Sequence, residues 1–290
     1  MSELTRGVTA GDVVASAAEA VGRTARQNRP WIERLARVGF VAQALVYLMI
    51  GWLALRAAME ARDVRADAAG ALGALNAQQY GALALVVIAI GSFGFALWQS
   101  IAAITDAGNE GTSARGIVHR VGRAVSSVLY LMLGAAAFRM LRGSGHSAQG
   151  GDAVRNSTVQ IMRAPAGRWL IGLVGVIVLA YAAHEFYSAY HAKMIDRLDL
   201  SSLSPRGRDV ATQLGRTGIA AHGVVLALVG WFVFRAAIDN NGWHAGGPAA
   251  AIRAIAVNQG ARAMGVVAVG LLAYGLFQLV QARYRRVELP

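Results

Sequence analysis

Six long apolar stretches, separated by polar segments, follow each other along the chain. Each is long enough to cross the hydrocarbon core of a bilayer, which takes about 20 predominantly apolar residues. The pattern predicts transmembrane helices near residues 36–58, 81–105, 120–141, 167–192, 215–237 and 261–283. A soluble six-helix bundle is disfavoured, because six charge-poor helices would leave almost no polar outer surface.

Three copies of one pattern make up these stretches. The first helix of each copy opens with Arg-x-Gly and continues, at constant spacings, to a second glycine and then an arginine. The opening glycines are Gly39, Gly122 and Gly218, the second glycines are Gly51, Gly134 and Gly230, and the arginines are Arg56, Arg139 and Arg235. Each copy therefore begins with the same kind of helix.

The second helix of each copy is repeated too. A glycine opens it, an aromatic residue follows at a constant spacing, and a carboxamide or carboxylate lies one helical turn further on. The glycines are Gly81, Gly167 and Gly260, the aromatic residues are Phe95, Tyr181 and Tyr274, and the last positions hold Gln99, Glu185 and Gln278. A copy of two helices begins and ends on one side of the membrane, so the copies are parallel repeats related by rotation about the membrane normal.

The expected fold is therefore an all-α polytopic membrane protein: six transmembrane helices in three tandem parallel hairpin repeats with pseudo-threefold symmetry. We expect an N-terminal cytoplasmic tail over 1–30, followed by repeat 1 over 31–110, repeat 2 over 111–200 and repeat 3 over 201–290, all in one membrane bundle.

The triplicated pattern resembles the bacterial domain-of-unknown-function family numbered 1206, whose members are membrane-embedded and typically carry three such two-helix units. The resemblance covers about residues 31–287. It implies the fold but no activity, since none is established for the family. The middle copy departs most from the pattern, with Ile177 where the others have Gly91 and Gly270, and with Glu185 in place of glutamine.

Composition agrees with a membrane protein. Hydrophobic residues make up 56% of the chain and charged residues 15%, against about 25% charged in typical soluble domains. A net charge of +12 would suit nucleic acid, but the arginines punctuate apolar runs as helix-end charges do, so no nucleic-acid partner is predicted. The absence of cysteine excludes disulfides and thiol catalysis, and no metal or cofactor motif is present.

Basic residues are distributed unevenly between the two sides of the predicted bundle. The N-terminal tail, the second and fourth loops and the C-terminal segment carry more Lys and Arg than the other three loops. Positive residues are enriched on the cytoplasmic side, and an even number of spans brings both termini to one side. We expect cytoplasmic termini and a multi-pass protein of the bacterial inner membrane.

Each of the three outer loops regains apolar residues shortly before the next span. These residues are Ala71, Leu72 and Leu75 in the first loop, Val154, Ile161 and Met162 in the second, and Ile252 and Ile255 in the third. The pattern predicts three short helices that lie against the outer surface of the bilayer.

Arg56, Arg139 and Arg235 form a triplicated set at the predicted outer helix ends. Arginines in such places commonly extend their head groups to the lipid–water boundary. The set is also a candidate contact for anionic lipid, or for anions at an outer vestibule.

A second triplicated set lies inside the spans. Gln43, Ser126 and His222 occupy the first helices, and Gln99, Glu185 and Gln278 occupy the second helices. A rise of 1.5 Å per residue puts both rows about 8–12 Å from the cytoplasmic helix ends, so we expect one polar layer. Hydrogen bonding between helices would explain it, but an ionisable group within a membrane also marks a pathway or ligand site, and Glu185 and His222 lead that hypothesis.

Three classes of function remain open. The first is a non-enzymatic membrane module that binds a lipid, a small molecule or a partner protein, and the second is a channel or transporter with a pathway near the pseudo-threefold axis. The third, ranked lowest, is an enzyme using Glu185 with His184 or His222 as acid and base. Besides the bilayer itself, an anionic lipid or a membrane protein is the expected partner. An open axis would favour transport, whereas a closed, glycine-packed axis with a groove between repeats would favour lipid or partner binding.

Overall fold

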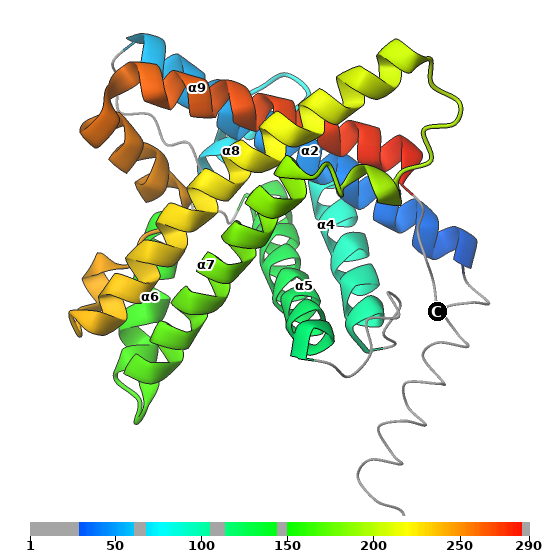
Figure 1. The fold of residues 1–290 in the computed structure, drawn as a ribbon. Coiled ribbons are helices and arrows are strands. Elements are labelled where there is room, and N and C mark those ends of the chain that lie inside the picture. Colours follow the sequence, from blue (N-terminus) through cyan, green and yellow to red (C-terminus); the bar gives the residue numbers. More distant parts are fainter. Residues whose placement is uncertain (1–28, 61–67, 105–113, 144–149, 286–290) are drawn as a thin grey trace, which may run out of the picture.

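The computed structural model describes residues 29–60, 68–104, 114–143 and 150–285 (Figure 1). Six long helices dominate this part of the chain, and all six have the length and apolar composition needed to cross a membrane. They are α2 (Arg29–Glu60), α4 (Gly81–Ile104), α5 (Ala114–Leu141), α7 (Gly167–Tyr190), α8 (Pro205–Ile238) and α9 (Pro248–Tyr284). The prediction of an all-α protein with six membrane-spanning helices is confirmed. Almost all of the predicted N-terminal tail lies outside the described residues.

Two helices extend well beyond the predicted spans. The helix α8 begins at Pro205, and the Ser204 side chain caps it by accepting a hydrogen bond from the backbone N–H of Gly207 at 3.2 Å. The helix α9 begins at Pro248 and bends at Gly260, whose φ of 85° is left-handed. Proline is tolerated at the first helical position because its missing N–H has no partner there.

The short helices between the two spans of each repeat differ from the expectation in their surroundings. They are α3 (Ala68–Asn76), α6 (Gly150–Met162) and the first turns of α9, with 3₁₀ turns η1 (Ile195–Arg197) and η2 (Gly242–His244) in two loops. Leu72 and Ile252 are almost fully buried in the main hydrophobic core. Helices were correctly predicted here, but α3 and the start of α9 turn their apolar residues towards the bundle rather than the lipid.

The six long helices pack in a regular order along the repeats. The second helix of each repeat packs against the first helix of the next, giving three equivalent pairs: α4 with α5, α7 with α8, and α9 with α2 (Figure 1). Within repeats 1 and 3 the two helices of the hairpin also pack together. In the described part of repeat 2, α5 and α7 make no comparable contact. The predicted pseudo-threefold symmetry is therefore not confirmed, because the ring of helices is not closed in the middle repeat.

The repeated glycines explain the three equivalent contacts between repeats. A Cβ atom on Gly51 would lie 2.9 Å from the backbone nitrogen of Leu272 in α9. One on Gly230 would lie 3.0 Å from the backbone nitrogen of Leu179 in α7, and one on Gly134 would lie 3.3 Å from the carbonyl oxygen of Ala89 in α4. Helix backbones approach this closely only where no side chain intervenes.

A second set of glycines marks the contact between the two helices of a hairpin, and this contact is missing in the middle repeat. A Cβ on Gly39 would meet the Cβ of Phe95 at 2.5 Å, and one on Gly218 would meet the Cα of Tyr274 at 2.5 Å. The equivalent Gly122 has nothing within 4 Å. The side chain of Ile177 stands where the other repeats have a glycine, so α7 cannot approach α5 as closely. We call this unpacked border between α5 and α7 the middle seam.

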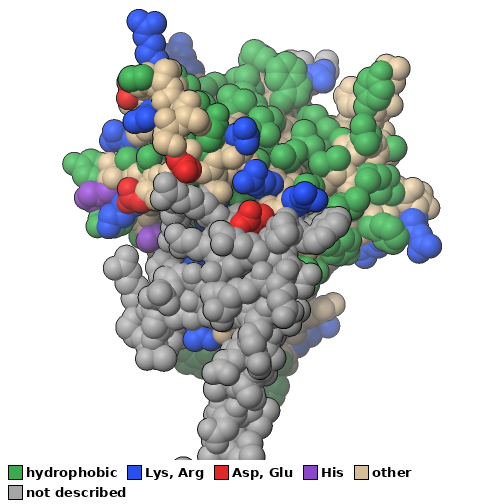
Figure 2. Space-filling view, turned by 90° about the vertical axis from the view of Figure 1, so that its right-hand side faces the viewer, with side chains coloured by type: hydrophobic (Ala, Val, Ile, Leu, Met, Phe, Trp, Pro, Cys, Tyr) green, Lys and Arg blue, Asp and Glu red, His purple; other side chains and the backbone are tan. Residues whose placement is uncertain are grey.

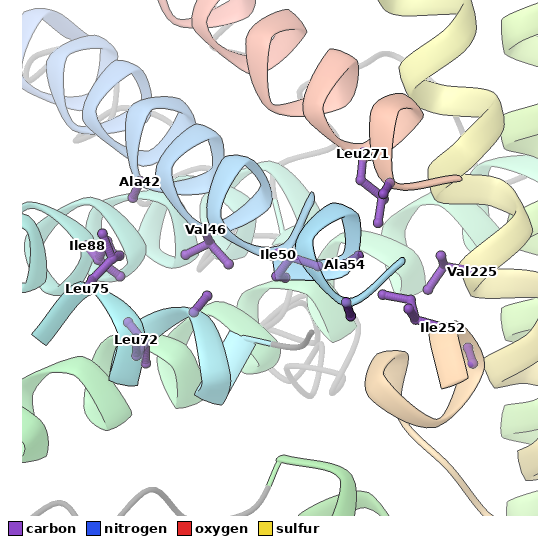
Figure 3. Close-up of a cluster of buried hydrophobic side chains, with 14 of the residues drawn as sticks. Ala42, Val46, Ile50, Ala54, Leu72, Leu75, Ile88, Val225, Ile252 and Leu271 are labelled. Carbon is purple, nitrogen blue, oxygen red and sulfur yellow. The ribbon is translucent and has the colours of Figure 1, made fainter. Parts of the chain in front are cut away.

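The main hydrophobic core is built around one face of α2. Ala42, Val46, Ile50 and Ala54 recur at every fourth residue on this face (Figure 3). They pack with buried residues of neighbouring helices, among them Leu75, Ile88, Val225 and Leu271. No residue of α7 belongs to this core. The helix α7 is therefore attached to the bundle chiefly through α8.

Candidate functional site

The structure brings Glu185 and His222 of the predicted polar layer into direct contact. The carboxylate Oε2 of Glu185, on α7, lies 2.7 Å from the imidazole Nδ1 of His222, on α8. Both residues are buried, with 7% and 8% of their surface exposed. Glu185 is the one acidic residue in the six predicted spans. A pair of this kind offsets the large cost of an isolated carboxylate in hydrocarbon.

Two tyrosines complete this cluster. The hydroxyl of Tyr47, on α2, lies 2.9 Å from Nε2 of His222, so both imidazole nitrogens have a hydrogen-bond partner. The ring of Tyr274, on α9, stacks on the imidazole with centroids 4.4 Å apart and packs edge-on against Tyr47 at 4.7 Å. Four helices thus converge on His222. Sequence reasoning did not include either tyrosine in the site, although each lies one helical turn from a predicted glutamine.

Gln43 and Gln278 form the equivalent pair between α2 and α9. The amide of Gln278 donates to Gln43, the amide of Gln281 donates to Gln278, and the guanidinium of Arg285 donates to Gln281. Because a guanidinium only donates hydrogen bonds, Arg285 sets the direction of the whole row. The row joins the end of α9 to the polar layer, and it has neutral side chains where the α7–α8 interface has Glu185 and His222.

At the third interface, between α4 and α5, the hydrogen bond is made by the residues that follow the predicted ones in sequence. The hydroxyls of Ser100 and Ser127 lie 2.7 Å apart, and Ser127 also donates to the carbonyl oxygen of Ala96 at 3.0 Å. The predicted Gln99 and Ser126 are half-buried beside them. Each of the three interfaces between successive repeats therefore carries a side-chain hydrogen bond at the predicted polar-layer positions or one residue after them.

Tyr181 marks the difference between the middle seam and the closed hairpins. It has 49% of its surface exposed, whereas the equivalent Phe95 has 5%. Phe95 packs against Gly39 of its own hairpin, but Gly122 offers Tyr181 no such contact. The side chain lies one helical turn before Glu185 on α7. The titratable cluster and the middle seam thus share one helix.

The triplicated arginines Arg56, Arg139 and Arg235 are all exposed. Arg235 donates from Nε to the carboxylate Oδ2 of Asp239 at 3.1 Å, and Nδ1 of His244 lies 2.7 Å from the same oxygen. Partial desolvation alone would raise the pKa of Asp239, but the hydrogen bonds and charges of Arg235 and His244 lower it. This exposed cluster fixes the turn between α8 and η2.

Comparison with known proteins agrees with the repeated architecture. Residues 38–106, 121–192 and 217–285 each match the family model described as Domain of Unknown Function (DUF1206). These three segments cover more than half of the chain. The chain belongs to the DUF1206 family. Each matched segment covers most of both long helices of one repeat, so the open middle hairpin is a DUF1206 unit like the closed ones.

A curated bacterial protein is similar to this DUF1206 chain over nearly its whole length. It is the "Uncharacterized protein YxxB" of Bacillus subtilis (strain 168), 28% identical over 263 residues, which are 90% of this chain and 94% of the relative. No solved structure matches the chain.

Proposed function

We propose that this protein is a non-enzymatic membrane module that binds a lipid at the middle seam. The observation that carries the proposal is the open middle hairpin: Gly122 has no opposing atom within 4 Å, and α7 contributes nothing to the described main core. The hydrocarbon region of a bilayer contains no free space, so acyl chains are the most abundant material available to fill an apolar border between two unpacked helices.

The side chains along the two helices suit an amphipathic ligand. Leu131 and Met132 of α5 and Leu173 and Val174 of α7 are exposed and apolar. Tyr181 adds an exposed aromatic ring with a hydroxyl group at the level of the polar layer. An acyl chain can pack against these apolar side chains, and basic residues at helix ends attract anionic head groups.

A channel or transporter near the axis is supported less well. The interior between α2, α4, α8 and α9 is filled by the apolar side chains of the main core, including Val46, Ile50, Val225 and Leu271 (Figure 3). A closed interior with an open border between two helices is the arrangement that favours lateral binding of a lipid over passage along the axis.

The proposed setting is the bacterial inner membrane with both termini in the cytoplasm. Support comes from α2 beginning and α9 ending on the same side of the bundle (Figure 1). Figure 2 looks onto that side and shows Lys and Arg side chains distributed over it between hydrophobic surfaces. Positive charge on this side fits the cytoplasmic bias of Lys and Arg.

The proposal can be tested with a phospholipid that carries a photoactivatable group in its acyl chain. The full chain is reconstituted, washed extensively in detergent so that only retained lipid remains, irradiated and analysed by mass spectrometry. We expect cross-links at Tyr181 and on the facing side of α5, and none at the equivalent Phe95, which serves as the matched control. Loss of all cross-links on washing would contradict specific binding, and a lipid label found on a co-purified protein instead of on Tyr181 would favour a partner helix.

A further inference from the structure

We propose that Glu185, His222 and Tyr47 form a proton-binding site inside the membrane, and that the bound proton strengthens the attachment of α7 to α8. The site would take one exchangeable proton, held on the imidazole between a carboxylate and a phenol. The proposal does not rest on lipid binding at the middle seam, although both features lie along α7.

The heavy-atom geometry accommodates both protonation states of His222. Without the extra proton, Nδ1–H of the neutral imidazole donates to Glu185, and the Tyr47 hydroxyl donates to Nε2. When a proton binds at Nε2, the imidazolium donates to Glu185 through Nδ1 and to the Tyr47 oxygen through Nε2. The separations of 2.7 Å and 2.9 Å suit a hydrogen bond in either state, so only the Tyr47 hydroxyl must turn.

Charge favours uptake of the proton. The unprotonated site carries the net charge of one carboxylate, which is costly in a low-dielectric region. The protonated site is a neutral carboxylate–imidazolium pair whose two charges share a hydrogen bond. A proton is thus the ligand that removes the net charge without requiring a new residue or a movement of the helices.

The surroundings of the pair contain few other groups that could supply or remove charge. Tyr47 comes from α2, Tyr274 from α9, Tyr181 from α7 itself and Tyr130 from α5, and Arg285 at the end of α9 is the cation that acts electrostatically on Tyr181. The equivalent polar contacts in the other two interfaces pair Gln43 with Gln278 and Ser100 with Ser127. Those side chains do not titrate, so the α7–α8 interface alone of the three can respond to a proton.

The helix α7 is the element most sensitive to this change. It lacks a packed hairpin partner and contributes to no part of the described main core. Its contact with α8 includes glycine-mediated packing at Gly175 and Gly230, a small apolar cluster around Ile171, and the Glu185–His222 pair. When the imidazolium loses its proton, the Nδ1–H hydrogen bond to Glu185 remains but the ion pair is lost, so the attachment of α7 to α8 weakens and α7 can move more easily relative to α5.

The first test is an NMR titration of the full chain with labelled histidines, reconstituted in nanodiscs of one phospholipid. The pH is varied from about 5 to 8, the range in which histidine usually titrates. The His222 signal is identified by its loss in His222→Gln. We expect it to titrate reversibly in the parent and its midpoint to move to lower pH by at least one unit in Glu185→Gln, a tenfold loss of proton affinity.

Two further variants separate this role from a structural one. Tyr47→Phe should shift the midpoint in the same direction by a smaller amount, because Nε2–H of the imidazolium loses its acceptor. Ser127→Ala, in an equivalent interface without titratable groups, should leave the midpoint unchanged. Glu185→Gln is expected to fold, since Gln99 and Gln278 occupy the same position in the sister repeats. A His222 signal that does not change with pH, or that titrates identically in Glu185→Gln, overturns the proton-binding site.

The second test measures the coupling to α7. The chain has no cysteine, so spin labels can be placed at Ala124→Cys in α5 and Val176→Cys in α7 without other changes. We expect the distance distribution across the middle seam to broaden as the pH rises through the His222 midpoint, and to be independent of pH in Glu185→Gln. A distribution that does not respond to pH in the parent protein overturns the coupling to α7.

Discussion

The same Gly→Ala substitution at three equivalent positions should have opposite effects on stability. The positions are Gly39, Gly122 and Gly218, which lie inside α2, α5 and α8. In an unobstructed helix interior, alanine is favoured over glycine by about 1 kcal/mol. A Cβ on Gly122 has nothing within 4 Å. Gly122→Ala should therefore raise the free energy of unfolding by the whole of this propensity difference.

At the other two positions the added methyl group meets a neighbouring helix. On Gly218 its Cβ would lie 2.5 Å from the Cα of Tyr274, whereas carbon atoms normally approach to about 3.5–4.0 Å. The helices α8 and α9 must separate by about 1 Å, and overpacking of this kind costs about 1–3 kcal/mol. Because the obstacle is backbone, we expect the upper end of that range, which leaves Gly218→Ala destabilised by about 2 kcal/mol after the propensity gain. Gly39→Ala should behave similarly, because its Cβ would meet Phe95 at 2.5 Å.

The assay compares apparent melting temperatures of the three variants in the same detergent and at the same scan rate. A difference of about 3 kcal/mol between Gly122→Ala and Gly218→Ala corresponds to roughly 6–12 °C, at 2–4 °C per kcal/mol. Gly122→Ala should melt at or above the temperature of the parent. If all three variants lose stability equally, the middle hairpin is packed like the others and the reasoning is refuted.

Three further outcomes are expected. Gly51→Leu should lower the free energy of unfolding by about 1–3 kcal/mol, since its Cβ would lie 2.9 Å from the backbone nitrogen of Leu272; a melting temperature equal to that of the parent would contradict close α2–α9 packing. A reporter active only outside the cytoplasm, fused after Pro290, should be silent, and activity would reverse the proposed topology. The lowered pKa of Asp239 means that its ion pairs stabilise the turn between α8 and η2 above the ordinary aspartate pKa and are lost as the pH falls through the lowered value. Amide exchange in residues 239–245 should therefore accelerate below about pH 4, and Asp239→Asn should abolish this dependence.

The number, type and order of the long helices could be predicted from sequence because each depends on a local property, the length of an apolar run. The repeat pattern also predicted correctly which glycines matter: Gly51 and Gly230 lie against the backbone of a neighbouring helix. The predicted ends were less accurate, because α8 and α9 continue beyond the apolar run into segments that start at a proline.

The open middle hairpin could not be predicted from the repeat pattern. Gly122 fits the pattern as well as Gly39 and Gly218 do, but a glycine permits a close contact without enforcing one. The difference arises on the opposite helix, where Ile177 replaces a glycine, and its effect depends on the three-dimensional distance between two helices. A similar limit applies to the polar layer: successive residues of a helix point about 100° apart, so the orientation of each helix decides whether Gln99 and Ser126 or their neighbours Ser100 and Ser127 face the interface.

The interruption of the helix ring at the middle repeat is tested most directly by three matched distances. Pairs of spin labels are placed on the cysteine-free chain at positions 41 and 90, 124 and 176, and 220 and 269, which are equivalent in the three repeats and lie near the point where the hairpin helices cross. Electron paramagnetic resonance in nanodiscs then gives one distance distribution per hairpin. We predict similar short distances in repeats 1 and 3 and a clearly longer distance in repeat 2. Three equal distances would show a closed threefold ring and would contradict the open middle seam.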